Sequence, residues 1–406
     1  MVRKALLVFM VLMLGCLHLH AQLATVSGTV VAAADGQRIA GASVSDEGRT
    51  VAVVTNDDGY FVLKMDSLPR AIVVSHLGYR TQRVLLSAGT SGLTVRLRPA
   101  SVQLSELLVV ADDPRQLVQK AIGRITHNYP RQPELYHCFY RETAMKRQHF
   151  ITVAEGVLDM YKTAYGRGMG RDRVAIRKGR RLLSPKRSDT LSVKVLGGPM
   201  GAVILDMVKN PDFLLNDEDL DNYDMKMEAP QVIGDRQQYV VSIMPRRQLH
   251  YALHTGRLYI DRQTLAFTRI ELSLDMSDRE KATRAILVRK PLGVRFRPRE
   301  VTFLVDYHTD GDVWRLSYVR TQFRFNCDWR RRLLATSFTA TCEMVVTSMA
   351  DAQGVQPIRG RDSFDQRDAF FDKVEYFRDP DFWQDYNIIE PTETLDKAIE
   401  RIVRKY

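Results

Sequence analysis

The chain has 406 residues, of which 45% are hydrophobic and 26% are charged, and its formal net charge is +11 at pH 7. This length suffices for two domains or more, and the ordinary hydrophobic content excludes a wholly disordered chain. The basic residues are spread out, and their densest cluster, residues 177–181, lacks interleaved aromatic residues. The charge therefore indicates a solvated basic face with weak attraction to anionic surfaces, rather than a nucleic-acid interface.

Residues 1–21 predict export. The positively charged Arg3 and Lys4 precede an apolar run at 5–14, which is too short to span a membrane readily. Ala21 ends the small-residue stretch that is typical of a signal-peptide cleavage site. Two processing events remain open, cleavage after Ala21 and lipoprotein processing at Cys16. The first is favoured because Met13 stands where a lipobox usually has leucine. We expect an exported protein, periplasmic or associated with the outer membrane, without a membrane span.

Residues 22–110 predict a small antiparallel β-sandwich. Asp-Gly pairs at 35–36 and 58–59 supply the positive φ angles that hairpins need. Alternation of apolar and polar residues between such turns puts one face of each strand inward. The predicted strands are 26–31, 42–44, 51–54, 60–63, 71–75 and 83–86.

Several motifs of this stretch follow the order of a known family. They are Gly28-Thr29-Val30, Asp35-Gly36, Gly41-Ala42-Ser43-Val44, Thr55-Asn56-Asp57-Asp58-Gly59-Tyr60-Phe61 and Gly78-Tyr79. On these residues the stretch resembles the carboxypeptidase-like regulatory domain, a transthyretin-like (prealbumin-like) sandwich that occurs beside many unrelated partners. The resemblance implies a fold and no reaction, since this module has no catalytic residues of its own.

Residues 111–360 predict a larger β-rich domain that opens with a helix at 114–128. Asp113 is the expected cap of this helix, and apolar residues recur along it at helical spacing. Residues 361–406 predict a tail of loops and helix, whose last helix has Thr392 as its expected cap.

Within this domain, β-branched and aromatic residues predict long amphipathic strands and hence a curved antiparallel sheet, half-barrel-like, with flanking helices. Interruptions at 202–209 and 217–223 look helical or irregular, and the glycine-rich run at 166–170 predicts a flexible hairpin tip. The predicted strands are 153–161, 174–177, 239–244, 257–260, 266–274, 283–288, 295–307, 313–325 and 337–346.

Two further resemblances concern the β-rich region. The run at 256–266 is similar to the strand-turn-strand units of outer-membrane lipoprotein-sorting proteins, which are half-barrels that shelter acyl chains. The region from 111 to 406 resembles exported Bacteroidetes proteins that contain the carboxypeptidase-like regulatory domain, a family that brings no assigned reaction. This second resemblance rests on the motifs Phe139-Tyr140-Arg141-Glu142, Lys178-Gly179-Arg180, Gly197-Gly198-Pro199, Lys209-Asn210-Pro211 and Tyr376-Phe377-Arg378-Asp379-Pro380.

Motifs for catalysis and metal binding are missing from the sequence. None of the nine histidines has a glutamate three residues later, as a zinc carboxypeptidase needs. His250 and His254 are four apart, but they lie between predicted strands, where that spacing does not bring side chains together. A serine-hydrolase elbow, a P-loop and a dinucleotide-binding turn are also absent. We therefore expect no enzymatic activity, no metal and no cofactor.

Two groups of residues are candidates for structural or binding roles. On a strand, Tyr140 and Glu142 share one face while Arg141 lies on the other, so these residues form either buried ion pairs that fix the strand register or part of a binding cavity. Cys327 and Cys342 bracket a hairpin-like stretch and form a disulfide if the strands place them opposite each other. Otherwise they are small buried apolar side chains.

The sequence as a whole predicts a non-enzymatic envelope protein. The sandwich is the expected docking or spacer module, and the β-rich domain is expected to bind an envelope protein or a lipid or glycan ligand. The first alternative is a periplasmic carrier of lipids or lipoproteins. The second, a hydrolase or carboxypeptidase-associated protein, is disfavoured because no catalytic motif is present.

Overall fold

The computed structural model describes residues 23–100, 113–185, 197–286, 294–311, 313–329, 335–376 and 382–404. The predicted export segment, with both candidate processing sites, lies outside the described residues. So does the predicted boundary between the two domains near residue 110. Among the residues described, no helix is long and apolar enough to cross a bilayer.

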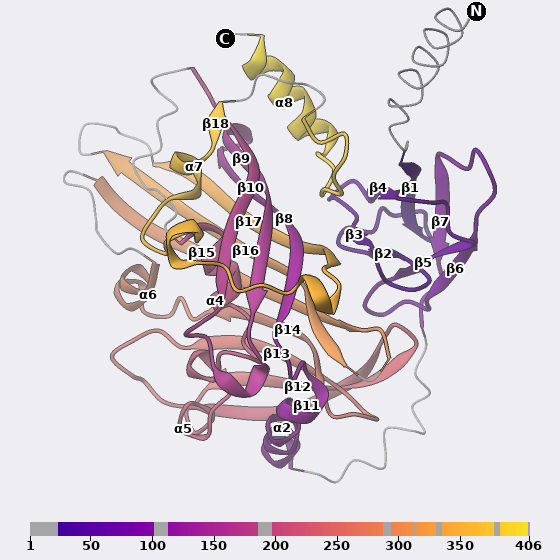
Figure 1. Cartoon of the computed structure of the whole chain (residues 1–406). Helices are drawn as coiled ribbons and strands as arrows, with labels where there is room; N and C mark the ends of the chain where they lie inside the picture. The colour runs from indigo at the N-terminus through magenta and orange to yellow at the C-terminus, as the bar shows by residue number, and fades with distance from the viewer. Residues whose placement is uncertain are drawn as a thin grey trace, which may run out of the picture.

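The N-terminal part is a sandwich of two small sheets, with strand orders β4-β1-β7 and β3-β2-β5-β6 (Figure 1). Each predicted strand lies within two residues of an observed one, and the structure adds β7, which pairs with β1 in parallel rather than antiparallel. At the turn before β4, Gly59 has a φ of 70° and approaches the Val30 carbonyl so closely that a Cβ would clash. The strands are β1 (Ala24–Ala32), β2 (Ser43–Asp46), β3 (Ala52–Val54), β4 (Tyr60–Met65), β5 (Ala71–Ser75), β6 (Gln82–Leu85) and β7 (Leu93–Leu97).

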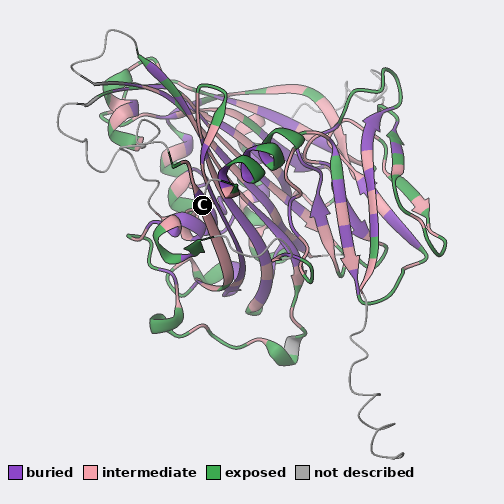
Figure 2. Cartoon of the chain, turned by 90° about the horizontal axis from the view of Figure 1, so that it is seen from above, coloured by how far each residue is buried: buried purple, intermediate pink, exposed green. Residues whose placement is uncertain are grey.

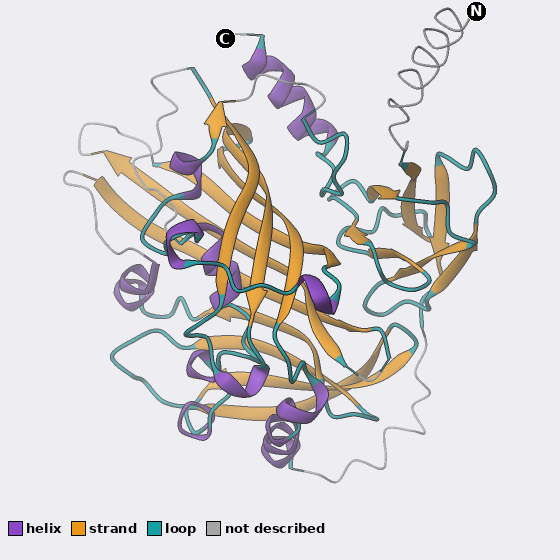
Figure 3. Cartoon of the chain, in the orientation of Figure 1, coloured by secondary structure: helices purple, strands orange, loops and turns teal. Residues whose placement is uncertain are grey.

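The second part is one curved sheet of 11 strands, which confirms the predicted fold class (Figure 3). All neighbouring strands pair antiparallel except β10 and β18, which pair in parallel. The strands are β8 (Glu134–Lys146), β9 (His149–Lys162), β10 (Arg173–Leu183), β11 (Tyr223–Ile233), β12 (Arg236–Pro245), β13 (His254–Asp261), β14 (Phe267–Leu274), β15 (Val294–Thr309), β16 (Trp314–Trp329), β17 (Thr336–Met349) and β18 (Glu375–Tyr376).

The order of strands brings the two ends of this domain together. After β10 the chain crosses to β11 at the opposite edge and returns strand by strand to β17, which pairs with β8. Glu142 on β8 therefore lies opposite Cys342 on β17, 200 positions later in the sequence. The middle of the sheet depends on this long-range pairing.

Short helices flank the sheet. The helix expected at 114–128 is divided at Arg124 into two. Of the strand predicted at 283–288, the last two positions lie outside the described residues, and the prediction is wrong over 283–286, because residues 279–286 are helical. There Asp278 accepts hydrogen bonds from the backbone N–H groups of Glu280 and Lys281, and this capping outweighs the β-propensity of the residues that follow. The α-helices are α2 (Pro114–Gly123), α3 (Ile125–Asn128), α4 (Gly198–Ile204), α5 (Asp217–Leu220), α6 (Arg279–Ile286), α7 (Phe370–Lys373) and α8 (Glu393–Val403).

The main core lies between α2, α4 and one face of the sheet, which we call the inner face. Figure 2 shows the buried residues running along the strands. The opposite, outer face carries a smaller apolar cluster that joins the sheet to the sandwich and to residues 382–391. Fully buried residues of the main core include Val118, Tyr136, Leu158, Val203, Leu258 and Ile270.

Residues 382–391, which we call the tail segment, connect the outer face of the sheet to the sandwich. The Lys64 ammonium donates hydrogen bonds to the carbonyls of Trp383 (2.7 Å) and Tyr386 (3.0 Å). The Asn387 amide accepts from the Lys64 N–H and donates to the Lys64 carbonyl, both at 2.8 Å. Asn387 thus satisfies the open edge of β4 as another strand would.

The sandwich also contacts the sheet directly. Asp57 forms an ion pair with Arg320 of β16 at 2.9 Å, and the backbone N–H of Thr81 donates to the Asp235 carboxylate at 2.9 Å. The Gly78 N–H donates to the Val232 carbonyl at 2.8 Å. The sandwich is therefore fixed against the sheet at several separate points.

The first prediction concerns the contact between the tail segment and β4. We expect Asn387→Ala to lower the free energy of unfolding by about 1–3 kcal/mol, because the N–H and carbonyl of Lys64 lose their partners. Hydrogen exchange of β4 should accelerate at the same time. Urea unfolding and amide exchange measure both effects. Asn326→Ala, at a half-buried asparagine of β16, is the control, and unchanged exchange in β4 would contradict the expectation.

Candidate functional site

A buried carboxylate on the outer face joins the sheet to the tail segment. Glu155 of β9 is 1% exposed and lies 2.7 Å from Arg141 of β8 and 2.8 Å from Arg180 of β10. The Trp383 indole N–H donates to the same carboxylate at 3.0 Å. Burial alone would raise the pKa of Glu155, but Arg141 and Arg180 outweigh it and lower the pKa to about 2. Arg141 also donates to the Ile389 carbonyl.

Tyr140 and Glu142 point to the inner face, as strand alternation predicts for neighbours of Arg141. The Tyr140 hydroxyl donates to Glu142 at 2.7 Å, and its ring packs edge-on against Phe370 of α7, with 5.1 Å between ring centroids. Burial raises the pKa of Glu142 to about 7, against the opposing effect of the Tyr140 hydrogen bond. The three candidates therefore belong to two separate environments. Of the three candidates, Arg141 is the one that lines a space of about 120 Å³, which residues of the sandwich, the sheet and α8 also line.

The two candidate disulfide cysteines lie on neighbouring strands in different places. Cys327 of β16 faces Thr336, whereas Cys342 of β17 faces Thr321. An offset of six positions corresponds to about 20 Å along a strand, and a disulfide needs Cα atoms within about 7 Å. The strands therefore do not place Cys327 and Cys342 opposite each other, as the predicted disulfide required.

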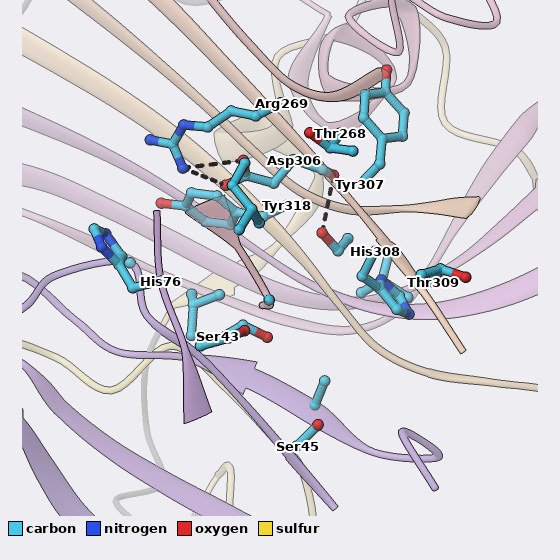
Figure 4. A pocket seen from close by; sticks show the side chains of 18 of the residues that line it. Ser43, Ser45, His76, Thr268, Arg269, Asp306, Tyr307, His308, Thr309 and Tyr318 are labelled. Atoms are coloured by element: carbon cyan, nitrogen blue, oxygen red, sulfur yellow. Dashed lines mark hydrogen bonds and ion pairs between the residues drawn. The ribbon is translucent and has the colours of Figure 1, made fainter. Parts of the chain in front are cut away.

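A cavity of about 100 Å³, lined by both polar and apolar residues, lies between the sandwich and the outer side of the sheet (Figure 4). The sandwich contributes Ser43 and Ser45 of β2 and His76 after β5, and the sheet contributes His308 of β15 and Trp314 of β16. This volume equals that of about three water molecules in the liquid. The cavity exists only because the two domains are fixed against each other.

The charged groups of the cavity are mostly arginines. Arg269 is paired with Asp306 at 3.1 Å and with Glu271 at 2.7 Å, and Arg236 is paired with Asp261 at 2.7 Å. Figure 4 shows the Arg269–Asp306 pair above the serines of the sandwich. Arg269 and Arg236 are therefore compensated, whereas Arg49, which also lines the cavity, has no ion pair within the described residues.

Several polar groups that line the cavity have no partner in the described part of the chain. They are the hydroxyls of Ser43 and Ser45, the imidazole of His308 and the buried indole N–H of Trp314, which is 3% exposed. Buried polar groups are nearly always satisfied by protein, water or ligand. The cavity therefore presents both hydrogen-bond donors and acceptors to whatever occupies it.

Both cavity histidines are neutral at physiological pH. Burial and the nearby Arg269 lower the pKa of His76 to about 4, although the Leu77 carbonyl opposes the shift. Burial and the positive charge of Arg49 lower the pKa of His308 to about 4, although the negative charge of Asp310 acts to raise it. The neutral imidazole of His308 thus offers one donor and one acceptor to the cavity, whereas His76 donates its Nδ1–H to the Leu77 carbonyl at 3.0 Å.

The N-terminal sandwich is the part of the chain in which the sequence motifs predicted a carboxypeptidase-like regulatory domain. Residues 26–109 match the model of the CarboxypepD_reg-like domain. The match covers the sandwich and ends before the curved sheet begins. No curated protein sequence matches the chain.

Several solved structures are similar to part of the chain at low sequence identity. One is a DUF1329 family protein from Desulfovibrio piger, with 10% identity over 60% of this chain and 96% of that chain and a TM-score of 0.26. Another is a LolA superfamily protein from Nitrosomonas europaea, with 12% identity over 62% of this chain and 100% of that chain and a TM-score of 0.21. TM-scores this low do not establish a shared architecture.

Sequence patterns gave no signal for the cavity. Its lining comes from strand ends and turns of both domains, and its histidines, serines and tryptophan occur in the sequence without motif or spacing. Only the docking of the CarboxypepD_reg-like domain on the sheet brings them together. The Glu155 cluster was indicated in part, since Arg141 was singled out, but its partners Glu155, Arg180 and Trp383 were not.

The second prediction concerns Glu155. We expect Glu155→Gln to reduce the free energy of unfolding by about 3–5 kcal/mol, because Arg141 and Arg180 remain buried without their counter-charge. The matched control, Glu300→Gln, breaks an exposed pair with Arg324 and should cost about 0–1 kcal/mol. Equal effects in chemical unfolding would contradict the assignment.

The same carboxylate predicts a dependence of stability on pH. Since the pKa of Glu155 is lowered from 4.5 to about 2 by folding, its contribution is complete above pH 4.5 and is lost as the pH falls through 2. Glu155→Gln should therefore remove part of the acid sensitivity in this window. Urea unfolding between pH 5 and 2 measures this loss.

The third prediction concerns His76 and His308. Folding lowers the pKa of each from 6.5 to about 4, so the unfolded chain binds more protons in this window and the folded state loses stability as the pH falls. The double variant His76→Asn/His308→Asn should flatten the stability profile between pH 6.5 and 4. Some slope remains, because burial also lowers the pKa of His254 to about 4. An unchanged profile would show that these histidines are not buried as described.

Proposed function

We propose that this protein is an exported, non-enzymatic binding protein of the cell envelope, whose ligand site is the cavity between the CarboxypepD_reg-like domain and the curved sheet. The ligand is a small polar molecule or the polar end of a larger one. Export rests on the N-terminal sequence pattern. The absence of catalytic motifs from the sequence supports a binding role over a hydrolase.

The observation that carries the proposal is the set of unpartnered polar groups around the cavity. The side chains of Ser43, Ser45, His308 and Trp314 make no hydrogen bond within the described residues, and all four residues line the same partly open cavity. Of these groups, the indole N–H of Trp314 is buried without a partner in the described part of the chain. Leaving a buried donor unsatisfied costs about 1–3 kcal/mol. A ligand that satisfies several of these groups would recover that free energy on binding.

The fixed arrangement of the domains supports the same role. When two domains are held rigidly, a site that they share is already formed before a ligand binds. Binding then carries no free-energy cost for ordering the domains. The Asp57–Arg320 ion pair and the Lys64 contacts with the tail segment hold them at separate points. The docking module thus becomes part of the ligand site.

A carrier of lipids or lipoproteins is the second candidate. Such a carrier needs a large apolar space, and the inner face of the sheet is the natural place for one. This face is covered by buried side chains of α2, α4 and residues 205–215, including Val118, Val203 and Leu214. This packing favours the polar cavity over an acyl-chain site.

The fourth prediction tests the proposed site. Native mass spectrometry of the chain purified from its own envelope should detect a small polar adduct. Ser43→Met fills the cavity and should remove the adduct, whereas Ser273→Met, at a half-buried serine of β14 outside the cavity lining, should retain it. Thermal unfolding of both variants checks that they are folded.

Two results would overturn the proposed site. One is wild-type protein that carries no adduct. The other is an adduct that persists in Ser43→Met, and if organic extraction identifies that adduct as a lipid, the carrier becomes the better explanation.

A further inference from the structure

A second hollow lies on the surface near the end of β9, far in sequence from the interdomain cavity. It has a volume of about 740 Å³, within the usual range for small-molecule sites. Two segments form it, the turn after α3 and the loop between β9 and β10. We call it the arginine pocket, since its polar lining comprises Arg131, Gln132, Tyr161, Thr163, Arg167 and Arg171.

The lining of the arginine pocket contains three guanidinium groups and no carboxylate. Arg131 donates to the carbonyls of Thr126 and His127, which leaves its charge uncompensated. Arg167 and Arg171 make no side-chain hydrogen bond or ion pair within the described residues. By contrast, the arginines of the interdomain cavity and of the Glu155 cluster mostly face carboxylates. The pocket therefore concentrates positive charge that an anion would neutralise.

A buried ionic network fixes the loop that carries Arg167 and Arg171. Asp172 accepts hydrogen bonds from the N–H and hydroxyl of Thr163, both at 2.9 Å, and so joins the two ends of the loop. Lys209 is 1% exposed, and its ammonium donates to Asp172 at 2.7 Å, to the Thr163 hydroxyl at 3.1 Å and to the Thr163 carbonyl. All three ammonium protons of Lys209 are thus donated, so Lys209 holds Thr163 and Asp172 together.

The same network ties this loop to the other wall of the pocket. Asp206, fully buried, accepts hydrogen bonds from Lys162 at 2.6 Å and from the Tyr165 hydroxyl at 2.8 Å. The rings of Tyr165 and Tyr129 stack with 5.0 Å between their centroids. The backbone N–H of Tyr165 donates to the carbonyl of Pro130, the residue before Arg131. Both arginine-bearing segments are therefore anchored on one buried cluster, and the positions of their backbones are set before any ligand arrives.

We infer that the arginine pocket binds the phosphate group of a phosphorylated ligand. Guanidinium groups bind phosphate oxygens through paired N–H donors, and several arginines around one site suit a group with more than one negative charge. The volume exceeds that of an isolated phosphate and fits a head group or a small phosphorylated metabolite. This site is independent of the interdomain cavity and does not rest on the function proposed for it.

The test uses the full mature chain and three probes. Isothermal titration calorimetry measures binding of inorganic phosphate and of glycerol 3-phosphate. Sedimentation with vesicles compares phosphatidylglycerol mixed into phosphatidylcholine with phosphatidylcholine alone. Binding of glycerol 3-phosphate in solution identifies a free phosphorylated ligand, whereas binding only to phosphatidylglycerol vesicles identifies a lipid head group. If the protein binds none of the three probes, the inference is wrong.

Variants separate the pocket from general charge attraction. Arg167→Gln/Arg171→Gln should weaken binding about a hundredfold, a factor of about ten for each lost charge-assisted contact. The control, Arg359→Gln/Arg361→Gln, removes the same charge from two exposed arginines elsewhere and should leave affinity unchanged. Arg167→Lys/Arg171→Lys keeps the charge without the paired donors and should give an intermediate affinity. Equal weakening by the pocket and control pairs would also overturn the inference.

Discussion

The buried Glu155 carboxylate is the interaction on which the arrangement of the two domains depends. Arg141 and Arg180 reach it from the strands on either side of β9, and Trp383 reaches it from the tail segment. The tail segment in turn holds Lys64 and the open edge of β4. A buried charge on the outer face is thus connected, through one short stretch of chain, to the CarboxypepD_reg-like domain.

The tail segment is thus one of several links that position the N-terminal domain, beside the Asp57–Arg320 ion pair and the hydrogen bonds of Thr81 and Gly78 with the sheet. Release of the tail segment from Glu155 would weaken its contacts with Lys64 and so would loosen one link between the two domains. The arginine pocket depends on a different buried network, that of Asp172, Asp206 and Lys209. Each candidate binding site therefore rests on its own group of buried charges, and neither group lies in the apolar core of the sandwich.

The sequence predicted the strands well because their signal is local. Alternation within single segments located β1 to β6 and most strands of the curved sheet, and the Thr392 cap located the start of α8, where its hydroxyl accepts from the Leu395 N–H. It failed at 283–288, where a cap at Asp278 outweighed β-propensity. It could not find either pocket, because Ser43 and His308, or Arg131 and Arg171, come together only through tertiary packing. The run at 166–170, expected to be a flexible hairpin tip, does join β9 to β10, but hydrogen bonds anchor both of its ends.

The pairing of β8 with β17 has a consequence for the order in which the chain is made. A ribosome that adds about 5–20 residues per second completes β17 roughly 10–40 s after β8. Throughout that interval one edge of β8 has no neighbour, and such an edge readily recruits strands from other chains. The nascent protein therefore has a long window of vulnerability to aggregation, in which a chaperone, or retention of the whole chain in an unfolded state, would protect it.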